Sequence, residues 1–166
     1  MLALKNNRSR TVDTAKADVS TIVDIPTGFD FQVLAPLEMV TDQFSEVSFA
    51  CAIALVPSNP RFIAKPGQLV VMPTGNDNQL TIALEDTVDA FCLWGRCTQP
   101  MILKVLESNG NVLEIRSDAG CHLPETQDIQ DADLLPLQIL ELEDMNGVAM
   151  IELSAQAPFV IEGLSI

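Results

Sequence analysis

The stretch from Gln68 to Arg116 constrains the fold most, because short apolar runs alternate there with turn clusters about every ten residues. The turn clusters read TGND, GRCTQP and SNGN. Short strands at this regular spacing are typical of β-sandwiches and barrels. The stretch therefore predicts an all-β fold, and a β-sandwich of the jelly-roll type is the architecture that we expect.

Two Asn-Gly pairs mark predicted tight turns. Asn109-Gly110 lies between the apolar runs of Met101–Arg116, and Asn146-Gly147 lies within LELEDMNGVAMIEL. Asn-Gly favours two-residue hairpin turns, because both residues readily adopt positive φ. The sequence therefore predicts two hairpins of similar design, followed by a last strand in APFVIEGLSI.

The register of the predicted second hairpin places acidic side chains together. Counting outward from its turn pairs Leu140 with Leu153 on one face. On the other face Glu141 comes opposite Glu152, with Glu143 beside them. Like charges directly opposite destabilise a sheet, and no Lys or Arg follows Arg116 in the chain. We therefore expect water, a cation or a basic segment to relieve this acidic surface.

A basic N-terminal arm is the richest source of such cations. We divide the chain into an arm, residues 1–24, and a β-sandwich domain, residues 25–166. Residues 1–16 carry a net charge of +3 and residues 17–166 carry −17, which sum to −14. Lys5, Arg8 and Arg10 are expected to dock on Glu141, Glu143 and Glu152, of the same or a neighbouring subunit; a solvated tail is the alternative. The acidic domain also argues against nucleic-acid binding.

The region before Gln68 predicts a mixture of elements. Ile25–Leu34 reads as a strand, and Pro36–Val47 has the spacing of a short helix. Ser48–Val56 reads as one strand that has bulky residues on one face and small residues on the other. The small residues are Ser48, Ala50, Ala52 and Ala54. Such a face permits close approach of a second backbone, so Ala50, Ala52 and Ala54 are predicted interface residues.

Low charge content also favours association between chains. Charged residues make up 19% of the chain, against about 25% in an average soluble domain. Some apolar surface is therefore expected to be covered by other subunits, and a homo-oligomer, with a trimer favoured, is the prediction. A well-filled monomeric core is the alternative.

No motif predicts a catalytic, cofactor or metal site. Cys92 and Cys97 with Cys121-His122 offer zinc-ligand chemistry, but their spacing is wider than that of structural zinc sites. The acidic loop with Asp128, Asp131 and Asp133 has oxygen ligands but lacks the pattern of a helix–loop–helix calcium site. We expect no enzyme activity and no cofactor. A calcium ion in that loop is left open.

The sequence predicts neither an export signal nor a membrane-spanning segment. The first residues lack a basic start followed by a long apolar core. The longest apolar run, Phe49–Val56, is too short to cross a bilayer. Reduced thiols are therefore the expectation for the four cysteines.

The overall profile resembles the bacteriophage capsid decoration (cement) proteins, which are small, β-rich and often trimeric. This resemblance implies a non-enzymatic structural protein on the exterior of a virion, assembled in the host cytoplasm, with the major capsid protein or another virion structural protein as its partner. The closing APFVIEGLSI is similar to the last strand of jelly-roll carbohydrate-binding modules. The alternative function is a carbohydrate- or receptor-binding β-sandwich associated with a virion or tail. Trp94 and Arg96 would contact the sugar in that case, but a Trp94 buried at a strand end is the state that we expect. A faint likeness to dUTPases is rejected, because the chain contains no Tyr.

Overall fold

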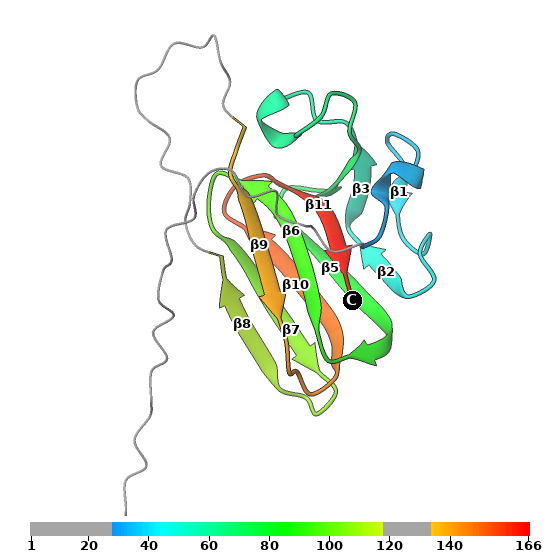
Figure 1. Cartoon of the computed structure of the whole chain (residues 1–166), viewed down its shortest axis with the longest axis vertical. Helices are drawn as coiled ribbons and strands as arrows, with labels where there is room; N and C mark the ends of the chain where they lie inside the picture. Colours follow the sequence, from blue (N-terminus) through cyan, green and yellow to red (C-terminus); the bar gives the residue numbers. More distant parts are fainter. Residues whose placement is uncertain (1–27, 118–133) are drawn as a thin grey trace, which may run out of the picture.

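The computed structural model describes residues 28–117 and 134–166, which form two antiparallel sheets stacked face to face (Figure 1). In spatial order, sheet A contains β1 (Met39–Val40), β3 (Ala52–Leu55), β4 (Val70–Pro73), β11 (Phe159–Ser165), β6 (Phe91–Cys97) and β9 (Leu137–Leu142). Sheet B contains β2 (Val47–Ala50), β5 (Gln79–Val88), β10 (Val148–Ala155), β7 (Met101–Glu107) and β8 (Val112–Arg116). Two short 3₁₀ helices, η1 (Phe31–Val33) and η2 (Pro60–Phe62), complete the described elements.

The connectivity of the last eight strands is that of a jelly roll. Strands β4, β6, β9 and β11 lie in sheet A in the order β4-β11-β6-β9. Strands β5, β7, β8 and β10 lie in sheet B in the order β5-β10-β7-β8. The chain thus crosses between the sheets at almost every turn, which is the double Greek-key pattern of this fold. The predicted fold class is confirmed.

Alternation of apolar and polar residues explains which face each strand of sheet B buries. In β7, Met101, Leu103 and Val105 are fully buried, whereas Lys104 between them is exposed. Strand β6 differs, because all seven of its residues are buried. Its inward residues join the core, and its outward residues lie beneath covering loops. Such two-sided burial accounts for its almost uncharged sequence.

The first predicted hairpin is confirmed and the second is wrong. Strands β7 and β8 pair around Gly110, whose φ is +86°. Strand β9, in contrast, pairs with β6 in sheet A, while β10 pairs with β5 and β7 in sheet B. The segment around Gly147, with φ +74°, therefore carries the chain from one sheet to the other. Sequence-local turn chemistry cannot distinguish these two uses of Asn-Gly.

The predictions for residues before β4 fail for local reasons. The expected helix over Pro36–Val47 is absent, and the two-residue strand β1 occupies part of that range. The expected single strand over Ser48–Val56 is broken at Cys51, whose φ of +60° turns the chain from sheet B into sheet A. The apolar residues of Pro36–Val47 are therefore spaced by the turns of the chain at the edge of the sandwich and not by a helical period.

The predicted strand over Ile25–Leu34 is also wrong within its described part. Asp30 caps the 3₁₀ helix η1 by accepting a hydrogen bond from the backbone N–H of Gln32, at 2.9 Å. Phe31 of this turn enters the core beside Phe44 and Phe49. The predicted domain boundary after residue 24 lies outside the described residues. None of the helices in the described ranges has the length and apolar character needed to cross a membrane.

Candidate functional site

The predicted small-residue face does not exist as one surface. Because the chain turns at Cys51, Ala50 lies exposed on sheet B while Ala52 and Ala54 are fully buried in the core. Phe49 enters the same core from sheet B, opposite the sheet that carries Ala52 and Ala54. Ala52 and Ala54 therefore cannot contact a second chain, and their assignment to an interface is wrong. Of the three predicted alanines, Ala50 alone is accessible.

The predicted acidic surface is divided between the two sheets. Glu141 lies on β9 opposite Cys92 of β6, whereas Glu152 lies on β10 opposite Lys104 of β7. Lys104 Nζ is 3.6 Å from Glu152 Oε1, so this carboxylate has a basic neighbour. Glu141 and Glu143 are exposed at the β9 side. The expected pairing of Glu141 with Glu152 is wrong, because the strands that carry them belong to different sheets.

Several predicted residues lie outside the described residues. They are Lys5, Arg8 and Arg10 of the arm, Cys121 and His122 of the zinc alternative, and the three aspartates of the calcium alternative, Asp128, Asp131 and Asp133. Docking of the arm therefore stays a prediction, and calcium binding by the acidic loop stays open.

The zinc alternative is not supported within the described residues. Cys92 and Cys97 lie at the two ends of β6 and, five residues apart, they point to opposite faces of sheet A. The described residues hold no group of three or more His, Cys, Asp or Glu side chains that could bind a metal ion. Burial, followed by the charge of Glu141, raises the pKa of the Cys92 thiol. This thiol is therefore a buried, protonated side chain.

The aromatic residues do not form a binding platform. Trp94 is 7% exposed, and its indole packs against the backbone of Gly163 and Gly28. A side chain at Gly163 would clash with this ring, since a Cβ there would lie 2.1 Å from Trp94 Cζ2. All seven phenylalanines are buried or half-buried. The stacking contact on which many sugar sites depend is therefore missing from the described surface.

A hollow of about 420 Å³ lies at the end of sheet A. It is lined by Gly28, Phe29, Glu46, Ser165 and Ile166. A smaller neighbouring hollow of about 160 Å³ includes Cys92, Glu141 and Glu143. Ser165 lines both hollows, with the carboxylate of Glu46 in the first and those of Glu141 and Glu143 in the second.

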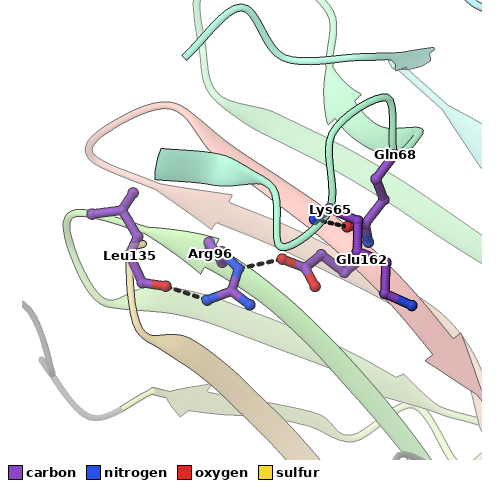
Figure 2. A network of polar contacts seen from close by, with 5 residues as sticks. All are labelled: Lys65, Gln68, Arg96, Leu135 and Glu162. Carbon is purple, nitrogen blue, oxygen red and sulfur yellow. Dashed lines mark hydrogen bonds and ion pairs between the residues drawn. The ribbon is translucent and has the colours of Figure 1, made fainter. Parts of the chain in front are cut away.

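A buried ion pair holds the outer face of sheet A in place. Arg96 of β6 pairs with Glu162 of β11, and their side chains are 8% and 6% exposed. The guanidinium also donates a hydrogen bond to the carbonyl of Leu135, and Figure 2 shows it between these two acceptors. The loop with Lys65 and Gln68 runs beside Glu162 in the same view (Figure 2). The Arg96 guanidinium thus binds both the Glu162 carboxylate and the Leu135 carbonyl, and it holds the segment before β9 against the outer face of sheet A.

The flank of the sandwich formed by β1 and β2 is sealed by the chain itself. A 2.9 Å bond from the Glu85 N–H to the Glu46 carbonyl sets the β2–β5 register, so the N–H groups of Val47 and Phe49 point away from β5. Both are satisfied, because Val47 donates to Phe44 and Phe49 donates to Thr41, at 3.4 and 2.6 Å. This edge of sheet B offers no free donors to another strand.

The opposite flank, formed by β8 and β9, carries a different edge (Figure 1). The N–H of Glu107 donates to the Asn111 carbonyl and that of Ser117 donates to the Met101 carbonyl, each at 2.9 Å. Odd-numbered residues of β8 therefore form the bonded pairs with β7.

It follows that the even-numbered residues of β8 direct their backbone groups outward. These residues are Val112, Glu114 and Arg116, and no hydrogen bond among the described residues occupies their N–H or C=O groups. We call this row the β8 edge. A row of free backbone groups on an exposed strand is a template for pairing with another strand.

Exposed apolar side chains gather at both flanks. One group, the β1 corner, contains Val33, Leu37, Met39 and Val56. A second group, the β8/β9 flank, contains Val112, Leu113, Leu134 and Ile139. Leu37 is 73% exposed although its φ of +66° is strained for a residue with a Cβ. Strained backbone at an exposed apolar residue is more typical of a functional surface than of a passive loop.

Comparisons with known proteins give no family. No protein-family model matches the sequence, and no curated protein matches it significantly. Among solved structures, the chain is similar to a family 6 carbohydrate-binding module, with 9% identity, a TM-score of 0.38 and coverage of 79% of this chain and 97% of that one. It is also similar to the enzymatically active domain of tailspike protein 4 of bacteriophage CBA120, with 13% identity, a TM-score of 0.32 and coverage of 79% of this chain and 18% of that one. At these scores, neither likeness carries an argument about function.

Sequence reasoning missed both flanks as candidate sites. Their definition depends on which strands end each sheet, and strand order follows from tertiary pairing. One local signal was present in VLEIR, residues 112–116, where apolar residues are not confined to alternate positions. Strict alternation is expected when only one face of a strand is buried, so this departure indicated an exposed apolar surface.

Proposed function

We propose that this protein is a non-enzymatic structural β-sandwich that links neighbouring subunits of a larger assembly. The observation that carries the proposal is the position of the exposed apolar side chains. Eight of the ten exposed large apolar side chains of the described residues belong to two groups at opposite edges of the sandwich, the β1 corner and the β8/β9 flank, and Met150 and Ile166 belong to neither. A protein that bridges two neighbours needs two such contact areas, whereas a protein that binds one small ligand needs a single concave pocket.

The specific setting that we propose is the exterior of a virion, where the chain would act as a capsid decoration protein. Jelly rolls occur among viral capsid domains and among lectins, so the fold is compatible with this setting without selecting it. The partner would be a capsid subunit that covers apolar side chains such as Leu37 and Met39, which are 73% and 51% exposed. The basic arm would add a further contact to an acidic surface of the same or a neighbouring subunit.

Carbohydrate binding is the second candidate. The outer face of sheet B offers hydrogen-bonding side chains on five adjacent strands, among them Thr81, Lys104 and Glu152. Such groups could receive sugar hydroxyls. The face has no aromatic side chain on which a sugar ring could stack, which favours the assembly function over this candidate.

The test measures binding of the full chain to capsid shells of its source, stripped of this protein, and to a glycan array in parallel. We expect the chain to cosediment with the shells, and the double variant Leu37→Ser with Met39→Ser to bind them with at least tenfold lower affinity. Ala64→Ser, at an exposed position that belongs to neither apolar group, is the control variant. Glycan binding without shell binding would replace the proposal with the second candidate, and binding to neither would contradict both.

A further inference from the structure

The β8 edge is the feature of the described molecule that most needs a partner. Its outward backbone groups are unoccupied among the described residues, whereas the corresponding edge of β2 is closed by hydrogen bonds to Thr41 and Phe44. Natural sheets protect long edges by covering them, bending them or placing charges on them. The chain uses the first device on the β2 flank. On the other flank, β8 (Val112–Arg116) carries two charges, Glu114 and Arg116, and no described residue forms a hydrogen bond with its outward backbone groups.

The side chains of this strand are complementary to a second copy of themselves. Glu114, Ile115 and Arg116 run negative, apolar, positive along the strand. In an antiparallel pair centred on Ile115, Glu114 of each copy lies opposite Arg116 of the other. Opposite charges in directly facing positions stabilise a sheet, and like charges destabilise it. The neighbouring register, centred on Glu114, would place two carboxylates face to face and is disfavoured.

The same register satisfies the backbone. Because Glu114 and Arg116 direct their N–H and C=O groups outward, each facing pair exchanges two hydrogen bonds in this arrangement. Ile115 then meets its own copy at the twofold axis as a non-bonded pair, in which side chains approach most closely. Leu113, which is 40% exposed and points toward the sandwich interior, becomes covered by the second copy. Charge, hydrogen bonding and apolar burial therefore all favour one register.

We propose that two copies of this chain associate through antiparallel pairing of their β8 edges, joining two five-stranded sheets B into one continuous sheet. This interface is isologous, so it builds dimers and assemblies with twofold axes, and not a threefold ring by itself. It goes beyond the proposed function, because it holds whether the partner of the assembly is a protein or a glycan. It also leaves the β1 corner of each copy free for that partner.

The decisive experiment is charge exchange between two variants of the full chain, measured by sedimentation equilibrium. Glu114→Arg places two cations opposite two cations in its own dimer, and Arg116→Glu places two anions opposite two anions. Each variant alone is expected to dimerise about tenfold more weakly than the unmodified chain, through two altered facing pairs. An equimolar mixture restores the affinity, because the two variants complement each other. Glu85→Arg, an exposed charge change on another strand, is the matched control and leaves the affinity unchanged.

A backbone test separates strand pairing from any other use of these side chains. Glu114→Pro removes an N–H that points away from β7 and therefore leaves the β7–β8 ladder intact. Glu114→Ala removes the same carboxylate but keeps the N–H. We expect the proline variant to dimerise more weakly than the alanine variant, while the two variants have equal melting temperatures. Three results would overturn the proposal. The unmodified chain could be monomeric at about 100 μM, or the mixture of Glu114→Arg and Arg116→Glu could fail to restore the affinity. The proline and alanine variants could also dimerise with equal affinity.

Discussion

At the scale of single residues, Glu107 connects the two Asn-Gly segments at one end of the sandwich. Its Oε1 accepts a hydrogen bond from the backbone N–H of Asn146 at 3.0 Å, and its Oε2 accepts one from the Asn109 side chain at 3.2 Å. Ser108 adds a backbone bond to Gly147 at 2.7 Å. One buried carboxylate therefore joins a true hairpin turn to a crossover between sheets.

These hydrogen bonds predict a loss of stability in acid. The Asn146 N–H, supported by side-chain donors, lowers the pKa of Glu107 below its ordinary value of 4.5 although burial opposes this. Protonation therefore favours the unfolded chain: the stabilisation is complete above about pH 4.5 and is lost as the pH falls through the lowered pKa. Glu107→Gln is expected to reduce stability at pH 7 and to flatten its decline between pH 5 and pH 3, as measured by urea unfolding.

A control is needed because Glu38 behaves similarly. The backbone N–H of Ala35, followed by the Gln43 side chain, lowers the pKa of this exposed carboxylate. Glu38→Gln therefore flattens part of the same decline, and the two effects are expected to add because the residues share no partner. An unmodified acid decline in the Glu107→Gln variant would show that its hydrogen bonds do not link pH to folding.

At the scale of elements, the buried pair of Arg96 and Glu162 joins β6 and β11 to the segment before β9. Removing one partner leaves a buried charge without compensation, which typically costs about 3–5 kcal/mol. Glu162→Met is therefore expected to destabilise the chain by roughly this amount. Arg96→Met also leaves the Leu135 carbonyl without its donor. The measurement is the free energy of unfolding in urea.

The double variant is the informative comparison. Arg96→Met combined with Glu162→Met removes both charges, and replacement of buried pairs by apolar residues is often nearly neutral. The double variant is expected to be more stable than either single variant. If instead the two losses simply add, the pair does not interact in the folded state and the fastening role assigned to it is wrong.

Elements also mark the limit of what the sequence could predict. The short strands after Gln68 and the hairpin turn at Asn109-Gly110 follow from local chemistry, and the structure confirms them: burial alternates along β7 and along the first half of β5. The turn at Cys51 could not be foreseen, because cysteine has no special preference for its φ of +60°. The partner of β9 was mistaken because a jelly roll pairs strands distant in sequence, and Glu141 was consequently assigned to the wrong neighbours. The β8 edge became visible only once strand order was known.

At the scale of the whole molecule, a net charge of −14 opposes every contact between copies. The β8 edge contributes contacts of a few ångströms between opposite charges, whereas the like charges of the two bodies act over much longer distances. The Debye length falls from about 30 Å at 0.01 M salt to about 10 Å at 0.1 M. Long-range repulsion is therefore screened before the direct contacts of Glu114 and Arg116 are.

If only the β8 edges and the net charge act between copies, dimerisation of the full chain strengthens as ionic strength rises over this range, as measured by sedimentation equilibrium. Deleting residues 1–10 removes Lys5, Arg8 and Arg10 and no carboxylate, so the net charge changes from −14 to −17. If the arm is a solvated tail, the truncated chain repels its copies more strongly and its affinity rises more steeply with salt. If the arm docks on an acidic surface of a neighbour, salt weakens association of the full chain, and the deletion abolishes that dependence. The sign of the salt effect, compared between the two chains, thus distinguishes an arm that holds the assembly together from one that only lowers its net charge.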